Sequence, residues 1–205
     1  GGDQSVQARL LGYEGTLLSS LTALQYSTYA TSWNGPLVGP GGQLPYLTLY
    51  VDTNGDSTYD DRIFFEPEYS NGNYGNGDPN PQAPAGLGMW QTWDVLNGMV
   101  YNQNGPYGPG QDAVPFSTYL AANSTARIVE SAPGIGGIRI ATGFASDTDD
   151  FNTNLDSFVI STSLGGATYD FEPAAVPEAS AALFAALIST LSLGAVGVRR
   201  RFKRA

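Results

Sequence analysis

The sequence predicts an all-β body, a β-sandwich of jelly-roll type, followed by a single C-terminal transmembrane helix. Two observations predict the β body: Gly, Pro, Asn and Asp punctuate the chain, and the short runs between them are rich in Tyr, Phe, Val, Ile and Thr. A third observation predicts the helix, because the chain ends in about 20 uncharged, mainly apolar residues and a basic end. We therefore divide the chain into a body, residues 1–175, and a tail, residues 176–205.

The runs between the turn residues predict nine strands. Alternation is clearest at 46–52, where Leu47, Leu49 and Val51 share one face of a half-buried strand. One short helix and two long loops complete the body. The predicted strands are 8–11, 22–31, 46–52, 58–66, 88–95, 127–130, 137–144, 155–162 and 168–171, with the helix at 115–123 and the loops at 70–86 and 102–111.

Composition excludes several classes of function. All 19 acidic residues lie at or before Glu178, where only four residues are basic, so residues 1–178 carry a formal charge of −15. Such an acidic surface repels nucleic acid, and we expect no nucleic-acid partner. The chain has no Cys, which excludes disulfides, and no His, which removes the commonest general base and transition-metal ligand. It begins without Met or an apolar signal region, and we expect an export signal upstream.

An acidic run between two strand-like segments predicts a calcium site. Its oxygen-bearing residues occupy positions 1, 3, 5 and 9 of an EF-hand-like loop, and a backbone carbonyl at position 7 completes the front of the pattern. The run departs from that pattern at position 6, which is Ser57 instead of Gly, and at position 12, which is Ile63 instead of Glu. The candidate calcium ligands are Asp52, Asn54, Asp56, Thr58 and Asp60.

A second interpretation of the same run is mechanical. Asn54-Gly55 is the dipeptide that favours a type I′ turn, and the segments on both sides of it are strand-like. The run can therefore be a hairpin tip with solvated carboxylates, or a hairpin tip that also holds an ion.

Aromatic and acidic side chains supply two further candidate sites. Trp90 and Trp93 have opposite parity on one predicted strand, so at most one of them is buried in the core. The outward one, beside Tyr101 and Tyr107, would form a platform for a sugar ring. Hydrolysis of a glycan needs two carboxylates across a cleft. The candidates for that role are Glu66, Glu68 and Asp94.

The tail has three parts. Val176-Pro177-Glu178-Ala179-Ser180 comes first, and the apolar segment 179–198 follows, long enough to cross a hydrocarbon core of about 30 Å as a helix. A basic end at 199–205 closes the chain and predicts a cytoplasmic C-terminus with the body outside. The basic residues of this end are Arg199, Arg200, Arg201, Lys203 and Arg204.

These three parts resemble the PEP-CTERM sorting signal of Gram-negative bacteria. In that family, a Pro-Glu motif, a membrane helix and a basic end direct an exported protein to an exosortase, a membrane enzyme that processes it. Here the motif is Val176-Pro177-Glu178 followed by Ala179, where the family usually has a second Pro. A plain single-pass anchor would share the helix and the basic end, so the Pro-Glu motif alone distinguishes the two interpretations. The body also resembles, loosely, the exported β-sandwich domains joined to such tails.

The resemblance implies an exported protein, anchored in the inner membrane before processing and afterwards located at the cell surface or in the extracellular matrix. Its expected partners are an exosortase-type enzyme, the membrane and extracellular polysaccharide. We expect the body to be noncatalytic, with a structural or adhesive role. Two alternatives stay open: a carbohydrate-binding module supported by calcium, and a glycan-active enzyme.

Overall fold

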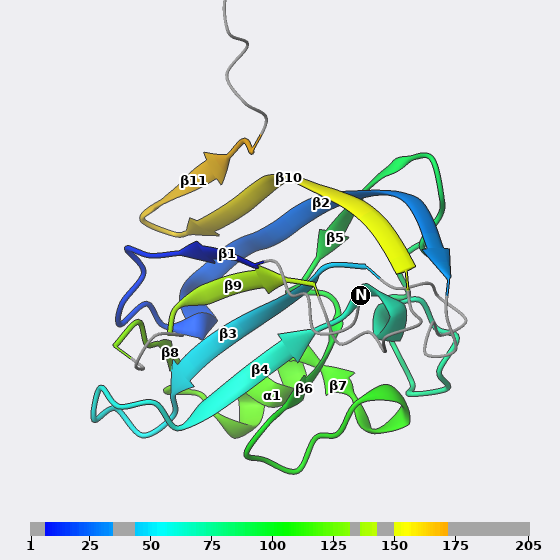
Figure 1. The fold of residues 1–205 in the computed structure, drawn as a ribbon. Helices are drawn as coiled ribbons and strands as arrows, with labels where there is room; N and C mark the ends of the chain where they lie inside the picture. Colours follow the sequence, from blue (N-terminus) through cyan, green and yellow to red (C-terminus); the bar gives the residue numbers. More distant parts are fainter. Residues whose placement is uncertain (1–6, 35–43, 132–135, 143–149, 172–205) are drawn as a thin grey trace, which may run out of the picture. The chain divides into compact units, whose positions relative to one another are not determined.

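The protein is represented by a computed structural model, which describes residues 7–34, 44–131, 136–142 and 150–171. The described helices and strands belong to residues 1–170, which form one compact unit. The described residues form two antiparallel sheets and one short α-helix (Figure 1). The prediction of an all-β body is confirmed.

The larger sheet has seven strands. Six of them follow the order β1-β9-β3-β4-β6-β7, and β8 pairs with the end of β3. All of these pairings are antiparallel. The strands are β1 (Gln7–Leu10), β3 (Tyr46–Asp52), β4 (Asp61–Phe65), β6 (Met99–Asn102), β7 (Val114–Pro115), β8 (Arg127–Ile128) and β9 (Ile138–Ala141).

The smaller sheet has four strands in the order β11-β10-β2-β5. Its central pair, β10 and β2, is long, and the pairing register shifts at three points along it. Such irregularities in a ladder increase the bend and twist of a sheet. Figure 1 shows this curvature in β10 and β2. The strands are β2 (Leu21–Asn34), β5 (Trp90–Asp94), β10 (Asp150–Thr162) and β11 (Gly165–Tyr169), and the helices are α1 (Phe116–Ala122) and the 3₁₀ turns η1 (Leu18–Ser20), η2 (Pro67–Ser70) and η3 (Gly110–Asp112).

One hydrophobic core joins the two sheets. Leu47, Leu49 and Val51 of β3 are all buried in it, as their period-two spacing predicts. Across the core, the ring of Tyr26 on β2 contacts the ring of Phe65 on β4 edge-on, with 6.1 Å between centroids. Full burial of each such side chain contributes about 1.5–3 kcal/mol to stability.

The opposite face of β3 differs from the half-buried face that alternation predicts. Thr48 and Tyr50 are 2 % and 0 % exposed. The neighbouring strands cover them with long side chains, because Arg62 of β4 and Arg139 of β9 both donate hydrogen bonds to the Tyr50 hydroxyl. Charged side chains thus cover the outer face of the larger sheet at this point.

Each of the nine predicted strands overlaps an observed strand, and β3 has the predicted bounds. The short strands β6 and β7 are not among the predicted strands: only Asn102 of β6 falls in the predicted loop, and only Pro115 of β7 falls in the predicted helix. β10 begins five residues earlier than predicted. The predicted helix is α1, with one residue fewer at each end.

In the part of the chain that the structure describes, no helix is long and apolar enough to cross a membrane. The predicted span 179–198, the motif 176–180 and the basic end 199–205 lie outside the described residues.

Candidate functional site

An exposed aromatic platform lies at the edge of the smaller sheet. Trp90 of β5 lies directly opposite Tyr29 of β2, and their ring centroids are 5.5 Å apart at an interplanar angle of 54°. Trp90 is 50 % exposed, and Leu87 and Met89, which precede it closely in the sequence, are 49 % and 54 % exposed. We call these four residues the Trp90 platform.

The backbone before β5 holds this platform against β2. Leu87 forms a bridge with Ala30, and the Gly88 amide donates to the Ala30 carbonyl oxygen at 2.8 Å. The Gln91 side chain closes the turn, because it accepts a hydrogen bond from the Gly86 amide and donates to the Pro84 carbonyl oxygen. The platform is thus fixed by hydrogen bonds at both ends and does not depend on one flexible side chain.

Trp93 lies on the other face of the same strand. It is 1 % exposed, and its indole N–H donates to the Thr28 hydroxyl at 2.8 Å. The prediction that one Trp of the pair is outside the core is confirmed. The aromatic partner of Trp90 is Tyr29, however, and not Tyr101 or Tyr107.

The predicted hairpin is confirmed, since β3 and β4 pair up to Val51 and Asp61. The predicted type I′ turn is wrong. Such a turn needs positive φ at both central residues, and Asn54 does not have it, whereas Gly55 (+92°) and Ser57 (+64°) do. A longer loop, residues 53–60, joins the two strands.

The Asp52 carboxylate organises this loop. It is fully buried and accepts hydrogen bonds from the backbone N–H groups of Asn54, Gly55 and Ser57 at 2.6–2.9 Å, with the Arg127 guanidinium 3.9 Å away. Burial raises the pKa of Asp52, but these hydrogen bonds and the charge of Arg127 lower it more, so the pKa lies below its ordinary value.

The loop 53–60 shares some features with an EF-hand-like calcium loop. Ser57 stands at position 6 of the predicted pattern and adopts the left-handed conformation that Gly supplies in a calcium loop. The carboxylate of Asp60, at position 9, accepts hydrogen bonds from the amide and hydroxyl of Thr53. That of Asp56, at position 5, accepts from the amide and hydroxyl of Thr58. Over the described ranges, no three acidic, His or Cys side chains gather closely enough to form a metal site.

Two of the candidate catalytic carboxyl groups lie near each other. Glu66 accepts a hydrogen bond from the Tyr101 hydroxyl, and burial raises the pKa of its carboxyl group. Burial, and next the negative charge of Glu66, raise the pKa of Glu68 to about 7, although hydrogen bonds with Tyr69 and Tyr74 oppose this shift. A carboxyl group that is partly protonated near neutral pH can donate a proton.

The third candidate, Asp94, stabilises a turn of the backbone. Its carboxylate accepts hydrogen bonds from the amides of Leu96 and Asn97 and from the Asn97 side chain. It therefore closes the turn after β5. These bonds occupy both of its oxygens and explain its position without a catalytic role.

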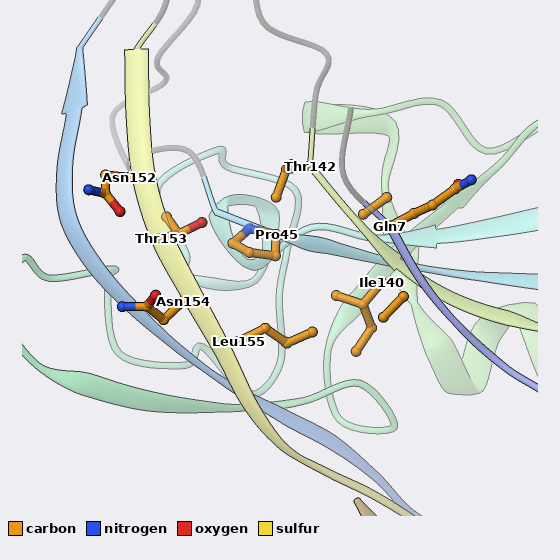
Figure 2. Close-up of a pocket in the computed structure, with 10 residues that line it drawn as sticks. Gln7, Pro45, Ile140, Thr142, Asn152, Thr153, Asn154 and Leu155 are labelled. Atoms are coloured by element: carbon orange, nitrogen blue, oxygen red, sulfur yellow. The ribbon is translucent and has the colours of Figure 1, made fainter. Parts of the chain in front are cut away.

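A cavity of about 590 Å³ opens between β10 of the smaller sheet and the β1–β9 edge of the larger one. Figure 2 shows Thr153 and Leu155 of β10 pointing toward Pro45 and Ile140, whereas the Asn154 side chain lies on the other side of the strand. None of the described residues that line this cavity is charged. These residues offer apolar and neutral polar contacts.

The sequence did not predict three features of the sites: the contribution of Tyr29, Leu87 and Met89 to the platform, the backbone conformation of Ser57, and the arrangement of Arg62 and Arg139 around Tyr50.

No protein-family model, curated protein or solved structure matches the chain. The sorting-motif residues Val176, Pro177 and Glu178 lie outside the described residues.

Proposed function

We propose that this chain is an exported cell-surface or exopolysaccharide-matrix protein with a noncatalytic, adhesive body. The tail supports the proposed export to the cell surface, because its Pro-Glu motif, its apolar segment at 179–198 and its basic end at 199–205 fit a PEP-CTERM-like signal. In this proposal the chain is held in the inner membrane until an exosortase-type enzyme processes it. It then reaches the cell surface or the matrix.

We assign the body to the β-sandwich class, with jelly-roll-like connections. What supports the assignment is the path of the chain, which passes between the two sheets in the steps β1→β2, β2→β3, β4→β5, β5→β6 and β9→β10. In such an architecture the strand edges and outer faces remain for contact with other molecules.

The observation that carries the adhesive role is the Trp90 platform. Three large apolar residues of the segment 87–90 are each about half exposed, although Trp is usually mostly buried. An aromatic ring flanked by apolar groups is suited to the carbon-bound hydrogens of a sugar ring. The ligand that we propose for it is an extracellular polysaccharide.

Two alternatives keep specific support. The loop 53–60 favours a calcium-supported carbohydrate-binding module, since Ser57 has the backbone conformation that a calcium loop requires. Glu66 and Glu68 favour a glycan-active enzyme, because Glu68 would be partly protonated near neutral pH.

One assay separates these functions. The full chain in mild detergent is mixed with exopolysaccharide purified from the cells that produce this protein. Cosedimentation of the protein and release of reducing sugar are measured in the same samples. The adhesive proposal predicts cosedimentation without reducing sugar, in the presence of a calcium chelator as well. Binding lost with the chelator would favour the calcium-supported module, sugar release abolished by Glu66→Gln would favour the enzyme, and no binding in any condition would contradict adhesion.

A further inference from the structure

Arginine side chains gather on the outer face of the larger sheet. Arg9 of β1 lies directly opposite Arg139 of β9, which in turn lies opposite Thr48 of β3. Like charges directly opposite on neighbouring strands destabilise a sheet. The placement is unusual, because residues 1–178 include 19 acidic residues and only four arginines.

Arg62 and Arg139 converge on one hydroxyl group. Their guanidinium groups donate to the Tyr50 oxygen at 3.1 and 2.7 Å, and both lie within 6 Å of the Tyr50 ring centroid. Among the residues with described positions, the one ion pair joins Arg127 to Asp52, so neither of these guanidinium groups has a carboxylate partner. Two adjacent positive charges that form no ion pair with a described carboxylate favour the binding of an anion.

Two buried donors on the same face of the larger sheet lack an acceptor. Thr48 is 2 % exposed and its hydroxyl has no hydrogen-bond partner, and the Nε of Arg62 is also buried without one. Buried polar atoms are nearly always paired, so each exception indicates a missing partner. An anionic oxygen would supply the acceptor that the Thr48 hydroxyl and the Arg62 Nε both lack.

The aromatic residues beside the arginines suggest what carries the anion. The Arg62 guanidinium lies 4.4 Å from the centroid of Phe64, which stacks on Tyr101 at 4.7 Å with an interplanar angle of 2°. This stacking restrains Arg62 before any ligand arrives. A carboxylate can accept two hydrogen bonds from one guanidinium group, while an attached sugar ring packs on the neighbouring aromatic side chains.

We propose that Arg62 and Arg139, together with Thr48 and Tyr50, bind the carboxylate of an acidic saccharide, such as a uronic acid residue. This site lies on the larger sheet, and it does not depend on sugar binding at the Trp90 platform on the smaller one. The acidic surface of the whole protein repels densely charged polymers. The ligand is therefore a saccharide in which carboxylates alternate with neutral sugars.

Calorimetric titration of the full chain in mild detergent tests this proposal. Hyaluronan tetrasaccharide, in which glucuronate alternates with a neutral sugar, should bind at least about tenfold more tightly than neutral chitotetraose. Arg62→Gln and Arg139→Gln should each weaken that binding about tenfold or more. Arg127→Gln is the matched control, since it removes the same charge from a guanidinium group that lies beside Asp52 instead of Tyr50, and it should keep the wild-type affinity.

Sodium glucuronate is a further probe. If it binds as tightly as the tetrasaccharide and with the same dependence on Arg62 and Arg139, the carboxylate site is supported and its ligand is a free sugar acid. Thr48→Val should weaken binding several-fold without lowering the melting temperature, because it removes a buried hydroxyl that has no partner.

Two results would overturn the proposal. One is no binding of either acidic probe by the wild-type chain, and the other is equal affinity in Arg62→Gln, Arg139→Gln and Arg127→Gln. Cosedimentation with neutral polysaccharide that depends on Trp90 would be unaffected by these arginine variants. The failure of this site and the failure of the adhesive function are therefore distinguishable.

Discussion

Trp90 and Trp93 lie three residues apart on β5 and differ in exposed fraction from 50 % to 1 %. Trp93→Ala should lower the free energy of unfolding by about 3–5 kcal/mol, because it opens a cavity in the core and leaves the Thr28 hydroxyl without its donor. Trp90→Ala should cost about 1 kcal/mol or less. Denaturant unfolding of both variants measures the difference. Equal losses would mean that Trp90 has a structural role.

The loop after β3 gives a second prediction. Ser57→Gly should raise the free energy of unfolding by up to about 1 kcal/mol, since Gly adopts the left-handed conformation at this position without the strain of a side chain. If the loop binds calcium, the ion should raise the melting temperature of the wild-type chain, and Asp56→Asn should reduce that increase. Calorimetry with no heat of calcium binding, together with an unchanged melting temperature, would contradict the calcium site.

The Glu68 carboxyl gives the stability of the body a pH dependence. Its pKa rises from 4.5 to about 7 on folding, so the folded state holds the proton more tightly than the unfolded state. Its contribution to stability is therefore present in full below about pH 4.5 and is lost as the pH rises to about 7. Because the carboxyl is partly exposed, we expect a loss of about 1–2 kcal/mol.

Glu68→Gln should remove that pH dependence, since Gln resembles the protonated acid. Thermal melts of both proteins between pH 4.5 and 8 measure the effect. The variant should be the more stable protein at pH 8 and should resemble the wild type at pH 4.5. Parallel curves for the two proteins would contradict the elevated pKa.

The tail predicts a processing defect. Replacing Pro177 and Glu178 with Ala should leave a longer, membrane-retained form in a host that contains an exosortase, because the helix and its basic end remain while the recognition motif is lost. Immunoblots of membrane and extracellular fractions measure it, and a host without the exosortase is the control. Unchanged size and location would leave the tail as a plain anchor.

Much of the fold could be predicted because the signals are local. The bounds of β3 follow from period-two alternation that ends at an Asp/Asn/Gly run. β6 could not be found this way, because its four residues continue into the Asn- and Gly-rich loop, and its strand conformation comes from pairing with β4. The turn was misjudged because the Asp52 carboxylate, bonded to three backbone amides, holds a loop longer than the type I′ turn that Asn54-Gly55 favours.

The sites were less predictable, because register decides which distant residues meet. Parity alone indicated that Trp90 or Trp93 would face outward. That Tyr29 would lie beside Trp90 depends on the pairing of β2 with β5, which no local pattern encodes. The same holds for Arg62 and Arg139, which reach Tyr50 from the strands on either side of it.

The most direct test of the adhesive function compares two variants in the cosedimentation assay with exopolysaccharide. Trp90→Ala removes the centre of the platform, and Leu164→Ala removes another exposed apolar side chain, 97 % exposed and away from the platform in the turn between β10 and β11. If the platform binds the polysaccharide, Trp90→Ala lowers binding about tenfold or more while Leu164→Ala binds like the wild type. Wild-type binding by Trp90→Ala, or the same loss in both variants, would contradict it.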